Sequence, residues 1–312
     1  MSNIRDLLKK SEMITYTYDQ CKKFYYKYMI SGENYVKRRF KQRLGRELEL
    51  ENPIKFNDKL QWLKFNWYDP FAQICADKYR VREFVAQKIT REYLNDIYGV
   101  YESVRDLDID KLPSSFVLKC NHGSGFNIIC KNKEKVNWKD EFRKLKRWLN
   151  RDYYFPNREW VYKGIKPRII CEKYLEEDTG DLKDYKIFCF HGEPKLIMVN
   201  VDRFKIRKRN FYDVNWNLMN VTSQFPRENR IIPKPPTLDE MLELSRILSK
   251  DFPHVRVDWY SVHNKIIFGE LTFFHASGYG IFKPVEFEIE MGSWLDLSKI
   301  KNNNGGEFDF SY

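Results

Sequence analysis

The pattern of apolar residues changes at Pro113 from one typical of helices to one typical of strands, and this change limits the possible folds. Residues 58–97 carry apolar side chains three and four positions apart, with a turn at Asp69-Pro70, and this spacing predicts helices. After Pro113 come short runs rich in β-branched and aromatic residues, bounded by turn residues, and these predict strands. The runs are FVLKC, GFNIICK, RIICEKYL, DYKIFCFHG, PKLIMVNV, VRVDWYSV and KIIFGELTF.

Two further helices are expected between these strands, over residues 136–150 and 237–250. In the second, Thr237 stands three residues before Glu240, which is the spacing of a capping box, so we expect Thr237 to cap the helix. A helical first third followed by strands and two helices indicates an α+β fold. The 312 residues have room for one large domain or two ordinary ones.

The chain carries 55 Lys and Arg against 44 Asp and Glu, and this excess favours anionic partners. Residues 1–50 hold twelve of the cations against six acids, interleaved with aromatic residues. Two interpretations of residues 1–50 stay open: amphipathic helices that lie on a membrane surface or an acidic polymer, and a helical appendage packed on the body. Without a long apolar run or an apolar signal core, we expect a cytoplasmic protein, with a peripheral contact at the inner face of the membrane left open.

The six cysteines contain no CxxC pair, and four of them lie in apolar, strand-like runs. We therefore expect buried thiols. The five histidines form neither HxxxH nor HExxH, so we expect no zinc site.

The first feature with chemical meaning is FVLKCNHGSG, a strand that ends near Lys119 and leads into His122, Gly123, Ser124 and Gly125. A glycine loop can turn backbone N–H groups toward a phosphate, and the lysine can reach the same oxygens. A plain β-hairpin with a surface lysine is the alternative. There is no GxxxxGK[ST], which excludes a phosphate-loop NTPase site.

The second and third features follow in order along the chain. In PRIICEKYLEED, an apolar strand runs into a charged segment at Glu172, where backbone groups could bind an adenine edge; an edge strand meeting solvent is the alternative. In DLKDYKIFCFHGEPK, Asp184 and Lys186 share a strand face, and Lys186 would bind phosphates as a second lysine.

The fourth feature is VRVDWYSVHNKIIFGELTFF, two strands joined at His263-Asn264. Alternation puts Arg256 with Asp258 on one face, and Glu270 with Thr272 on one face of the next strand. The two sets meet only if the pairing register is right, because a slip of one residue separates them. Together they would offer two carboxylates to Mg²⁺ and an arginine to a developing oxyanion; a surface Arg–Asp pair is the alternative.

These features in this order resemble the ATP-grasp superfamily, in which two α+β subdomains hold ATP between them. More narrowly, the chain is similar to the TupA-like ATP-grasp family of polysaccharide and teichuronopeptide biosynthesis, from about residue 52 to residue 296. The motifs that carry the likeness are NPIKFNDKLQWLKFN, ADKYRVREFV, LKCNHGSG, DYKIFCFHGEPK and GELTFFHASG.

The resemblance implies a role for each matching residue. Lys119 and Lys186 would bind ATP phosphates, Lys186 also acting in catalysis, and Arg256 would stabilise the tetrahedral intermediate. Thr272 stands where an Asn normally completes the metal site. The implied ATP-binding residues are His122, Gly123, Ser124, Gly125, Glu172, Lys173, Tyr174, Leu175 and Asp184 with the two lysines, and the implied Mg²⁺ ligands are Asp258, Glu270 and Thr272.

The substrate residues are expected outside these motifs. Ser277 and Gly278 follow the metal hairpin, where ATP-grasp ligases bind substrate carboxyl groups. Lys78 precedes the grasp and would shape the acceptor site, with a surface lysine on a helix as the alternative. Arg203 and Arg207, in the basic run RFKIRKR, would suit an anionic saccharide, with a solvated loop as the alternative.

The resemblance implies an ATP-dependent carboxylate–amine ligase that uses Mg²⁺. Its partners would be an anionic saccharide or lipid-linked saccharide and an amino acid or amino sugar, and we expect no nucleic acid. One rival is a glycosyltransferase with a DxD at Asp106-Asp108 or Asp108-Asp110. Others are an ATP-grasp sugar phosphotransferase and a non-catalytic basic module, the last of which leaves Asp258 and Glu270 without a role.

The same reasoning divides the chain into five parts. The first is a basic, aromatic and helical region, and the second is mainly helical. Two ATP-grasp subdomains follow, one with the glycine loop and one with the metal hairpin, and a loose tail ends the chain. The expected bounds are 1–57, 58–112, 113–175, 176–300 and 301–312.

Overall fold

The computed structural model describes residues 17–18, 20–21, 24–25, 32–177, 182–201 and 208–300. Their contacts group the chain into two compact units. Unit 1 comprises Met1–Arg38 and Asp96–Tyr174, and unit 2 comprises Arg39–Asn95 and Leu175–Tyr312. Residues 58–112, which the sequence groups as one helical region, therefore contribute to both units.

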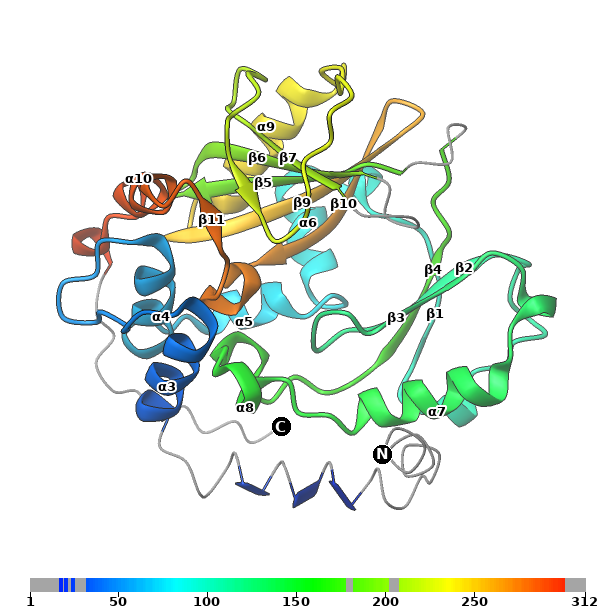
Figure 1. Cartoon of the computed structure of the whole chain (residues 1–312). Helices are drawn as coiled ribbons and strands as arrows, with labels where there is room; N and C mark the ends of the chain where they lie inside the picture. Colours follow the sequence, from blue (N-terminus) through cyan, green and yellow to red (C-terminus); the bar gives the residue numbers. More distant parts are fainter. Residues whose placement is uncertain are drawn as a thin grey trace. The chain divides into compact units, whose positions relative to one another are not determined.

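Unit 1 is built on a four-stranded antiparallel sheet in the order β1-β4-β2-β3 (Figure 1). In chain order its elements are β1 (Ile97–Tyr101), η3 (Val104–Asp106), β2 (Phe116–Cys120), β3 (Asn127–Cys130), η4 (Lys133–Lys135), α7 (Trp138–Leu149), α8 (Tyr154–Asn157), η5 (Trp160–Tyr162) and β4 (Ile169–Lys173).

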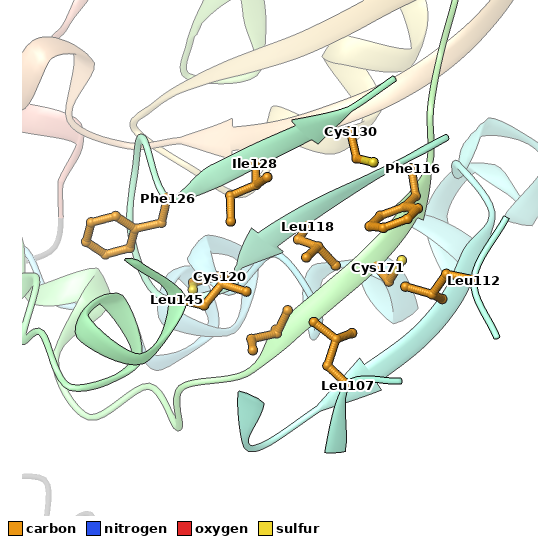
Figure 2. Packing of buried hydrophobic residues seen from close by; sticks show 11 residues of the cluster. Leu107, Leu112, Phe116, Leu118, Cys120, Phe126, Ile128, Cys130, Leu145 and Cys171 are labelled. Atoms are coloured by element: carbon orange, nitrogen blue, oxygen red, sulfur yellow. The ribbon is translucent and has the colours of Figure 1, made fainter. Parts of the chain in front are cut away.

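The two faces of the unit 1 sheet differ in character because side chains alternate along each strand. In β2, Phe116, Leu118 and Cys120 are fully buried, and they cluster with Leu145 of α7 (Figure 2). Lys119 alternates with them and therefore lies on the opposite face of the sheet. One face thus forms the core of unit 1, and the other is left for polar side chains.

Unit 2 is built on a five-stranded antiparallel sheet in the order β10-β9-β5-β6-β7, with a second small sheet of β11 and β8 (Figure 1). Its strands are β5 (Asp184–Phe190), β6 (Glu193–Val201), β7 (Lys208–Tyr212), β8 (Thr222–Ser223), β9 (His254–Val262), β10 (Lys265–Thr272) and β11 (Phe282–Lys283). Its helices are α4 (Phe56–Asn66), α5 (Pro70–Ala76), α6 (Val81–Ile89), η2 (Arg91–Tyr93), α9 (Leu238–Ser249), η6 (His275–Gly278), α10 (Glu286–Trp294) and η7 (Leu297–Lys299).

Helix α9 covers one face of the unit 2 sheet. Trp259 of β9 is fully buried there, and its Nε1 donates to Ser245 Oγ of α9 at 2.8 Å. Arg256 and Asp258 alternate with Trp259 along β9, so they lie on the face that α9 does not cover.

Residues 39–50 of the basic N-terminal region pack within unit 2. Helix α3 (Gly32–Leu44) contains the fully buried Phe40, and the Arg46 guanidinium lies 4.7 Å from its ring. Arg46 also donates to Asp58 and Glu288, at 2.8 Å each. For residues 39–50 the structure therefore shows the packed appendage. Among the described residues, no helix is long and apolar enough to cross a membrane.

The structure confirms the predicted strands and both predicted helices, the latter as Trp138–Leu149 and Leu238–Ser249. Thr237 is the N-cap residue of α9, as predicted, but the capping box was wrong, because the Thr237 side chain makes no capping bond and lies 3.4 Å from Ser261 Oγ instead. The expectation of buried thiols was wrong for Cys21, which is exposed outside the core, while the other five cysteines are buried. Among the described residues, four strands were missed: β1, β7 and the short strands β8 and β11.

We predict that Leu118→Ala lowers the free energy of unfolding by about 2–5 kcal/mol, because it leaves a cavity in the core of unit 1. Ile129→Ala in the neighbouring strand is the control, since Ile129 is 38% exposed. Calorimetric unfolding of both variants measures the difference. Equal small losses would show that this cluster does not stabilise the unit.

Candidate active site

A β-bulge in strand β10 determines which side chains meet on the open face of the unit 2 sheet. Near the hairpin turn, Phe268 pairs with Trp259. Beyond Gly269 the register shifts by one residue, so that Glu270 pairs with Asp258. Phe268 and Glu270 are two residues apart yet lie on opposite faces, because the extra residue reverses the alternation.

This register brings the two predicted pairs together. Glu270 is opposite Asp258, and Thr272 is opposite Arg256. On the other side of β9, Lys186 of β5 is also opposite Asp258. Residues paired across an antiparallel ladder share a face, so all five side chains lie on the face away from α9.

Arg256 is the centre of this group. Its Nε donates to Asp258 Oδ1 at 2.6 Å and its Nη2 to Asp258 Oδ2 at 2.7 Å, a bidentate pair. Nη2 also donates to Thr272 Oγ1 at 3.0 Å and lies 3.5 Å from Glu270 Oε1. The Thr272 hydroxyl in turn donates to Glu270 Oε1 at 3.2 Å. These bonds fix the plane of the guanidinium.

Two lysines complete the group. Lys186 forms ion pairs with Asp258 and, at 2.9 Å, with Asp184. Lys78, in the turn between α5 and α6, forms an ion pair with Glu270 Oε2 at 2.9 Å. With Arg256, the group has three cations and three carboxylates. We call these six residues the charged cluster: Lys78, Lys186, Arg256, Asp184, Asp258 and Glu270.

The cluster keeps Glu270 and Lys186 ionised despite their burial. Burial alone would raise the pKa of Glu270, but Lys78, Lys186 and Arg256 outweigh it and hold that pKa well below its ordinary value. Burial alone would lower the pKa of Lys186, whereas Asp184 and Asp258 raise it. At neutral pH both side chains are therefore charged.

A histidine completes the donor bonds of Arg256. Arg256 Nη1 lies 2.7 Å from His275 Nδ1, and because arginine only donates, Nδ1 accepts and the ring proton is on Nε2. His275 is buried against Phe188, with ring centroids 4.9 Å apart. Burial first, and then the charge of Arg256, hold the pKa of His275 well below its ordinary value.

Ser277 and Gly278 lie in a tight turn directly after His275. Ala276 and Ser277 have φ values of 48° and 57°, in the left-handed region that non-glycine residues rarely adopt. Helix α4 holds this turn: Gln61 Nε2 donates to the Gly278 carbonyl at 2.8 Å, and Lys64 Nζ donates to the Ser277 carbonyl at 2.8 Å. The turn is thereby fixed beside Arg256.

Unit 1 has its own lysine–carboxylate pair. Lys119 Nζ donates to Glu172 Oε2 at 2.6 Å on the face of the sheet away from α7. Val117 pairs with Glu172 in the ladder, so Lys119 and Glu172 are diagonal neighbours. The chain leaves unit 1 after Lys173 and Tyr174.

The glycine loop joins β2 and β3. Gly123 packs so tightly that an added Cβ would lie 2.6 Å from the Tyr153 ring, and Ser124 and Gly125 are exposed. The ring of His122 points elsewhere: it is buried, and its Nε2 lies 3.0 Å from the Trp148 carbonyl. The exposed part of the loop is therefore Ser124-Gly125.

The remaining predicted residues are two arginines of the basic run and the DxD candidates. Arg203 and Arg207 fall outside the described residues. In the DxD candidates, Asp106 accepts from the Ser103 backbone and Asp108 accepts from the Asp110 backbone, so both carboxylates take part in local turns. Asp108 also forms an ion pair with Lys111 at 3.1 Å.

The family model of the TupA-like ATP-grasp proteins matches residues 58–296 of this chain. The chain belongs to the TupA-like ATP-grasp family. The predicted family and the predicted α+β, ATP-grasp fold are confirmed. No curated protein matches the sequence of this TupA-like chain.

Solved ATP-dependent ligases resemble the structure at low identity. A D-alanine–D-alanine ligase from Bacillus anthracis complexed with ATP is 18% identical, with 64% of this chain and 54% of that chain covered and a TM-score of 0.36. The D-alanine–D-alanine ligase from Helicobacter pylori is 14% identical, with 77% and 69% covered and a TM-score of 0.42. The N5-carboxyaminoimidazole ribonucleotide synthetase from Thermus thermophilus is 10% identical, with 64% and 46% covered and a TM-score of 0.36. The TupA-like chain thus spans about half the length of the first of these relatives.

The oxygen atoms of the charged cluster fit Mg²⁺. Asp258, Glu270 and Thr272 offer carboxylate and hydroxyl oxygens, which this ion prefers. Within the described part of the TupA-like chain, no group of three or more His, Cys, Asp or Glu is placed to hold a metal ion. Magnesium, however, commonly takes one or two carboxylates and completes its shell with phosphate and water. The residues therefore fit an ion that arrives with a nucleotide.

Sequence reasoning missed the residues of α4 that position the 275–278 turn. Asn57, Gln61 and Lys64 are buried and polar, and they recur at helical spacing. A polar stripe at the core-facing positions of an otherwise amphipathic helix is a signal in the sequence, because buried polar groups need partners. The partners here are the Ser277, Gly278 and Gly280 carbonyls.

We predict that Gly269→Ala lowers the free energy of unfolding by about 1–3 kcal/mol, because strain must accompany the added methyl group. Its Cβ would lie 2.9 Å from the Asp258 carbonyl oxygen, and backbone cannot move aside as a flexible side chain can. Chemical denaturation measures the loss. Unchanged or increased stability would contradict the close approach at the bulge.

We predict that His275 stays neutral, with its proton on Nε2, from about pH 6.5 to pH 8, whereas an unperturbed histidine is half protonated near 6.5. The depressed pKa places protonation below this range. Nitrogen-15 NMR of labelled histidine distinguishes the two neutral tautomers and the cation. A titration within the range, or a proton on Nδ1, would contradict the bond from Arg256.

Proposed function

We propose that this chain is an ATP-dependent ligase that joins a carboxylate to an amine. The observation that carries the proposal is the Arg256 guanidinium, fixed by Asp258, Thr272 and His275 beside the Glu270 carboxylate. A cation held in place before the reaction stabilises a developing oxyanion at little cost in reorganisation. Membership in the ATP-grasp family supports ATP as the energy source.

The proposed reaction has two steps. A carboxylate oxygen of the substrate attacks the γ-phosphorus of ATP, the bond to the β,γ-bridging oxygen breaks, and ADP leaves with an acyl phosphate as the other product. The amine nitrogen then attacks the acyl carbon and loses a proton, and phosphate departs from a tetrahedral oxyanion. Arg256 would stabilise that oxyanion.

The proposed nucleotide residues come from both units. Lys119 and Lys186 would supply positive charge to ATP phosphates, and the exposed Ser124-Gly125 turn would supply backbone N–H groups. Residues 172–175 would bind adenine. In the structure each lysine is paired with carboxylates, Lys119 with Glu172 and Lys186 with Asp184 and Asp258, so binding ATP would require these pairs to exchange partners.

Asp258, Glu270 and Thr272 would hold Mg²⁺. When bound, the ion would neutralise negative charge on the phosphates. Glu270 is the most accessible of the three cluster carboxylates, with 27% of its side chain exposed against 4% for Asp184 and 2% for Asp258. We therefore assign to Glu270 the first contact with the ion.

The substrates would be chosen by residues around the 275–278 turn. Ser277 and Gly278 would bind the substrate carboxylate, and Lys78, which reaches Glu270, would shape the acceptor side. Arg203 and Arg207 would attract an anionic saccharide. We propose that the carboxylate or amine belongs to a uronic acid, an amino sugar or an amino acid in surface polysaccharide biosynthesis, as the family suggests.

We predict that Glu270→Gln lowers turnover at least about 100-fold, because it removes a charge aimed at the metal without changing the volume of the side chain. The assay is ADP and amide formation over a panel of carboxylates paired with amines, at saturating Mg-ATP. Glu193→Gln is the matched control, since Glu193 is exposed on β6 of the same sheet.

Wild-type turnover in Glu270→Gln would contradict the metal assignment. If wild-type protein formed ADP and a sugar phosphate without using an amine, the ligase proposal would be replaced by a phosphotransferase. Reduced turnover in both variants would show that the change acts through general surface charge.

A further inference from the structure

A basic groove of about 750 Å³ runs along helix α7 of unit 1. Three segments line it: α7 itself, residues 102–105, and residues 166–167. Six charged residues take part, five of them cations and one an acid. They are Arg105, Lys139, Arg143, Lys146, Lys166 and Glu102.

The cations follow the axis of α7. Lys139, Arg143 and Lys146 are four and then three residues apart, so they share one face of the helix. At a rise of 1.5 Å per residue they span about 10 Å. Arg105 and Lys166 come from the two other segments, so three separate segments of the chain bring positive charge to the groove.

The basic groove is separate from the proposed nucleotide site. Lys119 and Glu172 lie on one face of the unit 1 sheet, whereas Leu145 packs α7 against the other. The groove therefore has no part in the function proposed above, and the inference drawn from it stands or falls independently.

The walls of the basic groove are fixed by hydrogen bonds. The Trp148 carbonyl at the end of α7 is bound by His122, at 3.0 Å. The Lys166 carbonyl accepts from Asn121 Nδ2 at 3.0 Å, and Asn121 is fully buried. Pre-formed concave sites bind ligands with a smaller ordering cost than mobile surfaces do.

Among the residues that line the groove, cations outnumber acids. Glu102 forms ion pairs with Lys166 at 2.5 Å and with Arg168 at 3.7 Å, and Asp140 forms one with Arg143. The residues that line the groove still carry an excess of cations. Like charges on one helix face repel each other, and an anionic ligand would relieve this repulsion.

We propose that the basic groove binds a linear polyanion, a chain that carries several phosphate or carboxylate groups. Such a chain matches cations spaced along about two turns of helix. The apolar side chains between the cations would contact its uncharged parts; they are Val104, Phe142, Leu149 and Pro167. A concave groove suits a single chain better than a flat lipid surface. Residues 1–31 are an unsuitable occupant, because they carry six Lys or Arg against three Asp or Glu.

The test is binding of fluorescent linear polyphosphate to the full chain at about 0.1 M salt, where distant charges are screened. The variant is Lys139→Glu/Lys146→Glu. The control is Lys195→Glu/Lys265→Glu, two exposed lysines of unit 2 that give the same change in net charge. We expect the variant to bind at least about tenfold more weakly and the control to change less than about twofold.

Each competition arm decides between ligand classes. Displacement by poly-glutamate, but not by orthophosphate at equal phosphate concentration, supports a site for a polyanionic chain. Four results would overturn the proposal: no binding by the wild-type chain, equal weakening in variant and control, displacement by orthophosphate, or binding to phosphatidylglycerol vesicles without binding to polyphosphate. An unchanged thermal midpoint in both double variants shows that each is folded.

Discussion

The β-bulge at Gly269 is the constraint on which the candidate active site depends. Ahead of it, β10 buries Ile266 and Phe268 on the α9 side of the sheet; after it, the buried positions shift to Leu271. Without the extra residue, Glu270 would follow Phe268 onto the apolar face. The bulge thus lets one short strand contribute both to the core and to the charged cluster.

The charged cluster is stabilised because its positive and negative charges pair with one another. Three cations and three carboxylates are taken largely out of water, which is costly for each one alone and acceptable only when every charge has a partner. The buried guanidinium of Arg256 needs the most hydrogen-bond acceptors. Asp258, Thr272 and His275 provide them. Such a site is stiff without ligand, and under the proposed function its ion pairs would exchange partners with the phosphates of a nucleotide.

Much of this could be predicted from the sequence, because period-two alternation places Arg256 with Asp258 and Glu270 with Thr272. The pairing register of β9 and β10 could not be predicted from the sequence, because it depends on the position of the β-bulge. In the structure the buried apolar residues stand two apart up to Phe268 and then three apart to Leu271, but Ile266, Ile267 and Phe268 are all apolar, so the sequence does not show this spacing. His275 also escaped prediction as a partner of Arg256, because that contact depends on the tertiary path of the 275–278 turn.

The most direct test of the account is thermal unfolding of the wild-type chain and of Lys119→Ala with Mg-ATP, with Lys195→Ala as control. A ligand at a hundred times its dissociation constant stabilises the native state by about 2.7 kcal/mol. The account predicts a raised midpoint for the wild-type chain and the control, and none for Lys119→Ala. Stabilisation of all three, or stabilisation by a Mn-UDP-sugar in place of Mg-ATP, would contradict it.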